Sequence, residues 1–198
     1  MEEIEIRHKV AIAGTTSDEI TNQPIADVVV ELSGQNIHIK MCENGSFYLI
    51  NQQTGQVKLP TSLSKIQNGF FYFMDLPNGE YTLKVSAPNL KKRYAEEPKV
   101  QKVTVPNLQA NVQLSPTRLV GQVKRSDNNE PIVTALVKLG GSEYQTLTNE
   151  KGEYILLGIV AGKPTVQVSH PKFEQSSQQV ELVAGIEHIQ DFSLKPLS

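Results

Sequence analysis

A repeated phrase constrains the fold of this chain more than any other feature. The stretch NQPIADVVVELSG at residues 22–34 returns as NEPIVTALVKLGG at residues 129–141, an offset of 107 residues. A second pair, DLPNGEYTLKVSAPNL at 75–90 and GIVAGKPTVQVSHPKF at 158–173, matches at an offset of 83. The chain of 198 residues therefore contains one structural plan twice, and the first copy carries 24 extra residues, the difference between the two offsets.

The shared segments predict β-strands. Runs such as VVVEL, YTLKVS and TVQVS alternate or cluster β-branched and apolar residues, and Gly, Pro, Asn or Asp bounds each run. No segment of ten residues or more has a convincing helical period. Short antiparallel strands without covering helices are typical of β-sandwiches. We therefore predict an all-β chain of two tandem Greek-key-type β-sandwiches, with about seven strands in each.

The joint between the two copies is short. It lies in LSPTRL, around Pro116. Typical domains hold roughly 100–150 residues, so a chain of this length suits two small domains. We predict a first domain of residues 1–116, which carries the insertion, and a second domain of residues 117–198. A proline in so short a joint favours a semi-rigid connection.

The order of phrases in each copy resembles the carboxypeptidase regulatory-like domain, a transthyretin-like (prealbumin-like) sandwich. In the second copy the resemblance lies in GQVKRSDNNEPIVTALVKLGG, TNEKGEYILLGIVAGKPTVQVSHPKF and QDFSLKP. In the first it lies in GTTSDEITNQPIADVVVELSG, NGFFYFMDLPNGEYTLKVSAPNL and NVQLSP. The resemblance covers nearly the whole chain. It implies accessory modules that space, stabilise or contact other proteins, and it leaves the individual function open because fold and activity are separable.

Charge and hydropathy exclude several classes of partner. The formal net charge is −2, and each copy is close to neutral, so we expect no nucleic-acid binding. No stretch approaches the roughly 18 apolar residues of a membrane span, so we expect no membrane insertion. The start, MEEIEIRHKV, lacks the basic residues and apolar run of a secretory signal. We therefore expect a cytoplasmic location.

The sequence predicts no catalytic, cofactor-binding or metal site. The histidines His8, His38, His170 and His188 are scattered, without a metal or general-base spacing. Cys42 is the only cysteine, and no cationic neighbour would activate its thiol. The transthyretin-like fold also includes hydroxyisourate hydrolases that end in Tyr-Arg-Gly-Ser, whereas this chain ends in SLKPLS. A small hydrolase is therefore the least favoured function.

The aromatic residues concentrate in the first copy. Six of the twelve lie between Phe47 and Phe73. The hairpin phrase occurs there twice, as NGSFYLI and NGFFYFMDLPNG, so the inserted segment is either residues 51–74 or about residues 35–67. The second phrase fits the family pattern better. In either case the first domain is expected to carry a β-hairpin insertion.

The second alternative gives the aromatic residues opposite directions. Because side chains alternate along a strand, Phe71 and Phe73 would point inward and Phe70 and Tyr72 outward. Two interpretations remain open. The segment QVKLPTSLSKIQ could cover the two outward rings as a small separate core, or these rings, with Tyr48, could form a docking face for a protein or a sugar. Tyr48, Phe70 and Tyr72 are thus the candidate partner-binding residues.

The leading functional hypothesis is a non-enzymatic structural or adaptor protein. It would join protein partners within a larger assembly, such as a phage-tail-like particle, through edge strands and the insertion. Segments such as DVVVEL and ALVKL are strand-prone, and open sandwich edges can pair between molecules. The alternative is a carbohydrate-binding module with a glycan on the aromatic residues, although the chain has no tryptophan.

Overall fold

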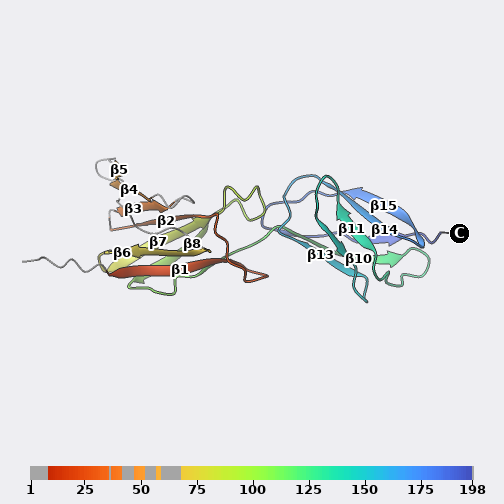
Figure 1. Ribbon diagram of the computed structural model, residues 1–198, viewed down its shortest axis with the longest axis horizontal. Coiled ribbons are helices and arrows are strands. Elements are labelled where there is room, and N and C mark those ends of the chain that lie inside the picture. Colours follow the sequence, from red (N-terminus) through yellow and green to blue (C-terminus); the bar gives the residue numbers. More distant parts are fainter. Residues whose placement is uncertain (1–8, 36, 42–46, 52–56, 59–67, 198) are drawn as a thin grey trace, which may run out of the picture. The chain divides into compact units, whose positions relative to one another are not determined.

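The computed structural model describes residues 9–35, 37–41, 47–51, 57–58 and 68–197. Within these ranges the regular structure consists of seventeen β-strands and no helix (Figure 1). None of the described residues forms a helix with the length and apolar character of a membrane span. The predicted all-β fold is confirmed.

The chain divides into two compact units. The first unit comprises Met1–Leu90 and Glu96–Leu114, and the second comprises Lys91–Ala95 and Ser115–Ser198. Each unit contains two sheets that enclose a core of buried apolar side chains. Each is therefore a β-sandwich, as the sequence predicts.

The first unit has a three-stranded and a six-stranded sheet among its described residues. In the smaller sheet, of order β6-β1-β9, β1 pairs antiparallel with β6 and parallel with β9. The larger sheet has the order β5-β4-β3-β2-β7-β8. The bounds are β1 Val10–Asp18, β2 Val29–Gly34, β3 Ile37–Met41, β4 Phe47–Asn51, β5 Val57–Lys58, β6 Phe70–Met74, β7 Gly79–Ser86, β8 Lys99–Val105 and β9 Val112–Leu114.

The second unit has two four-stranded sheets. One has the order β13-β10-β16, with β17 also paired to β10, and the other has the order β12-β11-β14-β15. The bounds are β10 Arg118–Arg125, β11 Leu136–Leu139, β12 Gln145–Leu147, β13 Glu153–Leu157, β14 Thr165–His170, β15 Phe173–Gln179, β16 Glu187–Ile189 and β17 Phe192–Leu194.

The strand pairing identifies the inserted segment. Phe71 of β6 lies opposite Gly14 of β1, and Tyr154 of β13 lies opposite Gly121 of β10. The phrase NGFFYFMDLPNG therefore follows the shared plan, and the extra residues lie between β3 and β6. This agrees with the second alternative, about residues 35–67, except that β3 lies within those bounds and is not part of the insertion. There β3 corresponds to β12, whereas β4 and β5 have no counterpart among the described residues of the second unit. Without these two added strands, the described residues of the first unit form seven strands, the number expected.

The core of each unit follows from the alternation of its strands. In β11, for example, Val137 and Leu139 are buried and Lys138 is exposed. The core of the second unit consists of apolar side chains from both sheets and their connections, namely Leu119, Val123, Ile132, Ala135, Val137, Leu139, Tyr154, Leu156, Ile159, Val166, Val168, Val180, Leu182, Phe192 and Leu194.

Two equivalent glycines allow the long central strands β1 and β10 to change partners. β10 pairs in parallel with β16 up to Val120 and with β17 from Val123, and Gly121 lies between these two regions. A Cβ atom at Gly121 would overlap the carbonyl oxygen of Gln190, which lies between β16 and β17. Gly14 has the same role against the carbonyl of Ala110. The division of the last strand into β16 and β17 explains why the second unit has eight strands.

A short segment from the first half of the chain belongs to the second unit. The backbone N–H of Thr117 donates to the carbonyl of Arg93 at 2.7 Å, and its hydroxyl donates to the carbonyl of Lys92 at 3.0 Å. The N–H of Ala95 donates to the carbonyl of Ser115. Lys91–Ala95 thus complete the second unit, although the predicted boundary assigns them to the first domain.

Candidate functional site

The outward side of β6 carries the aromatic pair that the sequence singles out. Phe71 and Phe73 are buried, whereas Phe70 is 45% exposed and Tyr72 is half-buried, so the predicted alternation is confirmed. The ring centroids of Phe70 and Tyr72 lie 6.0 Å apart, with the ring planes inclined by 43°. Among the described residues, β6 pairs with β1 alone and ends its sheet. Within this part of the chain, the two aromatic side chains lie on the last strand of the sheet.

The third candidate residue lies in the other sheet of the first unit. Tyr48 belongs to β4, in the six-stranded sheet, whereas Phe70 and Tyr72 belong to the three-stranded sheet. The side chain of Tyr48 is outside the described part of the structure, as are His8, Cys42 and residues 59–67 of the inserted segment. A docking face shared by all three aromatic residues, or a cover over Phe70 and Tyr72, stays a prediction.

An apolar row crosses the corresponding outer face of the second unit. Val120 of β10 lies opposite both Ile155 of β13 and Ile189 of β16. Directly opposite residues share one face of a sheet, so the three side chains form a row. Ile155 is 44% exposed and Ile189 is 72% exposed. At the border of this row, Arg118 and Glu187 form an ion pair at 2.7 Å.

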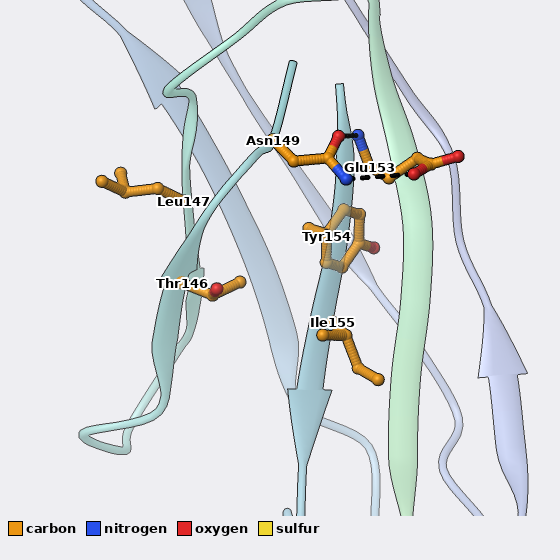
Figure 2. A pocket seen from close by; sticks show the side chains of 6 residues that line it. All are labelled: Thr146, Leu147, Asn149, Glu153, Tyr154 and Ile155. Carbon is orange, nitrogen blue, oxygen red and sulfur yellow. Dashed lines mark hydrogen bonds between the residues drawn. The ribbon is translucent and has the colours of Figure 1, made fainter. Parts of the chain in front are cut away.

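A surface pocket of about 310 Å³ lies where the two sheets of the second unit separate (Figure 2). Its lining comes from β12, β13 and their connection, namely Thr146, Leu147, Asn149, Glu153, Tyr154 and Ile155. Figure 2 shows Thr146 directed from β12 toward β13 and Leu147 directed away from it. Both strands are sheet edges, so the pocket lies between two open edges.

Hydrogen bonds fix one end of this pocket. The Asn149 Oδ1 accepts from the backbone N–H of Glu153 at 2.9 Å, and its Nδ2 donates to the Glu153 carboxylate at 3.0 Å. The Asn149 Oδ1 also accepts from the N–H of Lys151. The amide side chain thus holds the turn between β12 and β13 and presents the carboxylate of Glu153 at its surface.

The phenol of Tyr154 is a structural donor. Its hydroxyl donates to the carbonyl of Gln190 at 2.6 Å. Burial, with a smaller effect from the charge of Asp191, raises the pKa of Tyr154 well above its ordinary value. The hydroxyl therefore stays protonated at neutral pH and is unsuited to act as a base there.

A second surface pocket, of about 410 Å³, is lined by Arg93, Glu143 and Tyr144. The guanidinium carbon of Arg93 lies 5.8 Å from the centre of the Tyr144 ring, within the range of a cation–π contact. The Tyr144 hydroxyl donates to the carbonyl of Gly158 at 3.0 Å. The contact of Arg93 thus helps to attach the Lys91–Ala95 segment, and the hydrogen bond to Gly158 holds the Tyr144 ring in place.

The described residues contain no group of three or more His, Cys, Asp or Glu side chains that could hold a metal ion. Of the described histidines, His188 accepts a hydrogen bond from the backbone N–H of Val183 at 2.8 Å, and His170 accepts one from the N–H of Lys172. Both bonds join a ring nitrogen to the backbone of a nearby turn. They position loops and give no nucleophile–base pair.

Sequence reasoning missed the open edge of β12 and the row that Val120 forms with Ile155 and Ile189. The alternation in GEYILL does place Ile155 outward. The pairing of β10 with β16, however, joins positions about seventy residues apart, and no local pattern specifies that register. The exposed row becomes visible only once the sheet is assembled.

Comparison with solved structures finds similar β-sandwich chains at low identity. The Bacillus anthracis TIE protein is 13% identical, with a TM-score of 0.43 over 95% of this chain and 34% of that chain. The shaft pilin SpaA from Lactobacillus rhamnosus GG is 9% identical, with a TM-score of 0.40 over 96% of this chain and 99% of that chain.

A shorter match is a cohesin–X-dockerin complex from Acetivibrio cellulolyticus, 17% identical with a TM-score of 0.34. It covers 38% of this chain and 52% of that chain, so the match spans about half the length of that relative. Among curated proteins no match was found.

The family comparison concerns the second unit. Residues 118–195 match the family model of the carboxypeptidase regulatory-like domain. The first unit repeats the same strand pairing around Gly14 and Phe71, with β4 and β5 added. Residues 118–195 are thus similar to the carboxypeptidase regulatory-like domain.

Proposed function

We propose that this protein is a non-enzymatic structural or adaptor subunit that holds protein partners within a larger assembly. One observation carries the proposal: both units expose apolar or aromatic side chains on the outer face of the corresponding sheet. These are Phe70 and Tyr72 in the first unit and Ile155 and Ile189 in the second. Such exposed patches commonly mark sites of protein contact.

Exposure of these side chains has an energetic cost that a partner would remove. Burial of apolar surface contributes about 25 cal/mol per Å². Ile155 lies on the edge strand β13, so a backbone edge is accessible beside the apolar surface of the second unit; among the described residues, Phe70 and Tyr72 likewise lie on the last strand of their sheet. A protein partner can use both, through side-chain packing and strand pairing.

The ring geometry favours a protein over a glycan. Flat sugar rings stack on flat aromatic surfaces, whereas the planes of Phe70 and Tyr72 are inclined by 43° and form no single platform. A carbohydrate-binding module is therefore the second candidate, and a phage-tail-like particle is the specific assembly that we propose by analogy.

The proposal is tested by the double variant Phe70→Ser, Tyr72→Ser. The tagged protein is expressed in its own cell, and the mass of the native complex and the stoichiometry of its subunits are measured. We expect a stoichiometric protein partner with the unchanged chain and at least tenfold less of it with the double variant. The matched control is Leu108→Ser, since Leu108 is 62% exposed outside the strands.

Two results would count against the assembly role. One is a monomer without a stoichiometric partner when the complex is isolated gently from the native cell. The other is equal loss of the partner with the double variant and with Leu108→Ser. Binding to a glycan array that Tyr72→Ala abolishes would favour the carbohydrate-binding module.

A further inference from the structure

The edge of β12 has backbone groups that the second unit does not pair. The N–H of Thr148 donates to the carbonyl of Ala135, and the N–H of Leu139 donates to the carbonyl of Tyr144. Hydrogen-bonded pairs alternate along an antiparallel ladder, so these bonds fix which residues of β12 face β11. The backbone N–H and C=O groups of Thr146 point toward β11, whereas those of Gln145 and Leu147 point toward the open edge.

The first unit shows what can occupy this edge. β3 follows β2 as β12 follows β11, and each forms an antiparallel pair with the strand before it. In the first unit the sheet continues with β4, which pairs antiparallel along all of β3. In the second unit the sheet ends at β12. One copy of the shared plan therefore fills a position that the other leaves open.

We propose that the free edge of β12 receives an extended segment of a partner protein, which adds as an antiparallel strand in the position that β4 occupies beside β3. The inference rests on the proposed adaptor function and specifies one site for it. Main-chain hydrogen bonds to Gln145 and Leu147 would supply affinity, and alternate side chains of the segment would supply specificity.

The register of the first unit indicates the chemistry of the segment. In the first unit, Met41 of β3 lies opposite Val30 of β2. In the second unit, Thr146 of β12 lies opposite Val137 of β11, the residue equivalent to Val30. Thr146 therefore corresponds to Met41. Met41 in turn lies opposite Phe47 of β4. The segment residue opposite Thr146 therefore takes the place of an aromatic residue, beside the 310 Å³ pocket that Thr146 helps to line.

Two further features define the segment. Leu147 is 57% exposed on the outer face of the sheet, where it would pack against the next apolar side chain of the partner. Glu150 and Glu153 lie just beyond the C-terminal end of β12, and an antiparallel segment brings its N-terminal end there. We therefore expect a basic residue followed by alternating apolar residues, since opposite charges attract across an interface.

The probe is a synthetic peptide, KKGSFYLIN, in which two lysines precede the sequence of residues 45–51. Its affinity for the full chain is measured by fluorescence anisotropy, and its site is mapped by amide chemical shifts. We expect saturable binding, with shifts concentrated at Gln145–Leu147 and Ile155. A peptide with proline in place of its tyrosine should bind at least tenfold more weakly, because the residue opposite Gln145 then lacks its N–H.

The matching change in the protein is Gln145→Pro, which removes an N–H that points to the open edge. It should weaken peptide binding at least tenfold. Ser177→Pro is the control, because Ser177 is exposed on the edge strand β15, where the same alternation directs its N–H outward. It should leave the affinity within twofold. If Gln145→Pro unfolds, Leu147→Asp tests the same edge through an exposed side chain and should also weaken binding tenfold.

The proposal is overturned if the peptide does not bind, if its shifts centre away from β12, or if the β12 variants bind as well as the unchanged protein. It is also overturned if the isolated protein is a dimer that Gln145→Pro dissociates, because the occupant is then a second copy of this chain. None of these results removes a partner held at Phe70 and Tyr72, so failure here is distinguishable from failure of the adaptor role.

Discussion

Tyr154 shows how one side chain differentiates the two copies. It occupies the position of Phe71, which is buried in the first unit but has no hydroxyl. In the second unit the added hydroxyl donates to the carbonyl of Gln190 and connects β13 to the segment between β16 and β17. A buried phenol needs such a partner, because an unsatisfied polar group in a core is costly.

The raised pKa of Tyr154 predicts a loss of stability at alkaline pH. The folded state holds the phenolic proton more tightly than the unfolded state, so the contribution is fully present below the ordinary pKa of 10.0 and decreases as pH rises above it. The free energy of unfolding should fall by about 1.4 kcal/mol per pH unit above that value. Urea unfolding between pH 8 and pH 11, with second-unit fluorescence or amide probes, measures the slope.

Tyr154→Phe provides the matched variant. At neutral pH it should cost about 0.5–1.5 kcal/mol for the lost hydrogen bond, and above pH 10 its slope should be shallower than that of the unchanged protein. An identical alkaline slope in both proteins would show that Tyr154 does not cause the effect.

At the scale of elements, the change of partner along β10 depends on close approach of two backbones. The backbone of Gln190, between β16 and β17, lies against Gly121 of β10, and the backbone of Ala110 lies in the same way against Gly14 of β1. A side chain at either position would collide with a carbonyl group that cannot move without disturbing two strands. This steric requirement explains why both copies have glycine there.

Gly121→Ala should therefore destabilise the second unit by about 2–3 kcal/mol, because the methyl group overlaps backbone atoms. The control is Gly141→Ala, where the added Cβ has no atom within 4 Å and the cost of about 1 kcal/mol comes from its positive φ of 74° alone. Denaturant unfolding of the second unit compares the stabilities of the two variants. Equal losses of stability would contradict the close-approach explanation.

The elements differ in how far the sequence predicts them. Strands with a clear two-residue alternation, such as β6 with buried Phe71 and Phe73, are predicted together with their inward faces. The short strands β12, β16 and β17 have three residues each, too few for a periodic signal. Pairing defines them: β12 pairs with the nearby β11, and β16 and β17 pair with the distant β10. Of the candidate site, the outward directions of Phe70 and Tyr72 were predictable, whereas the open edge of β12 was not.

At the scale of the whole molecule, the contribution of Lys91–Ala95 to the second unit is the least predictable feature. The sequence predicts the boundary from the repeat and Pro116, and the segment lies well before that point. Its attachment depends on backbone groups, including the carbonyls of Lys92 and Arg93 that accept from Thr117. Backbone contacts of this kind leave almost no sequence signature.

The segment should stabilise the second unit measurably. We expect a fragment of residues 117–198 to be about 2–4 kcal/mol less stable than the second unit of the full chain, because several hydrogen bonds and the contact of Arg93 with Tyr144 are lost. A fragment in which a flexible Gly/Ser linker joins residues 91–95 to residues 115–198 should regain most of the lost stability. Urea unfolding measures the stability of both fragments.

The control carries the same five residues in scrambled order behind the same linker. It should regain less stability than the native order, since the Arg93 contact is misplaced. If residues 117–198 alone are as stable as the second unit of the full chain, the predicted boundary describes an independent domain.

Because the second unit is built from two separate segments of the chain, its parts are synthesised at different times. Lys91–Ala95 are synthesised before Ser115–Ser198, so Thr117, whose N–H donates to the carbonyl of Arg93, is not yet present when this segment is made. Until Thr117 is present, this stretch, with three consecutive cationic residues, is open to trypsin-like proteases and chaperones. Completion of residues 115–198 should end that exposure, so we expect protection of this stretch from trypsin to report that the second sandwich has closed.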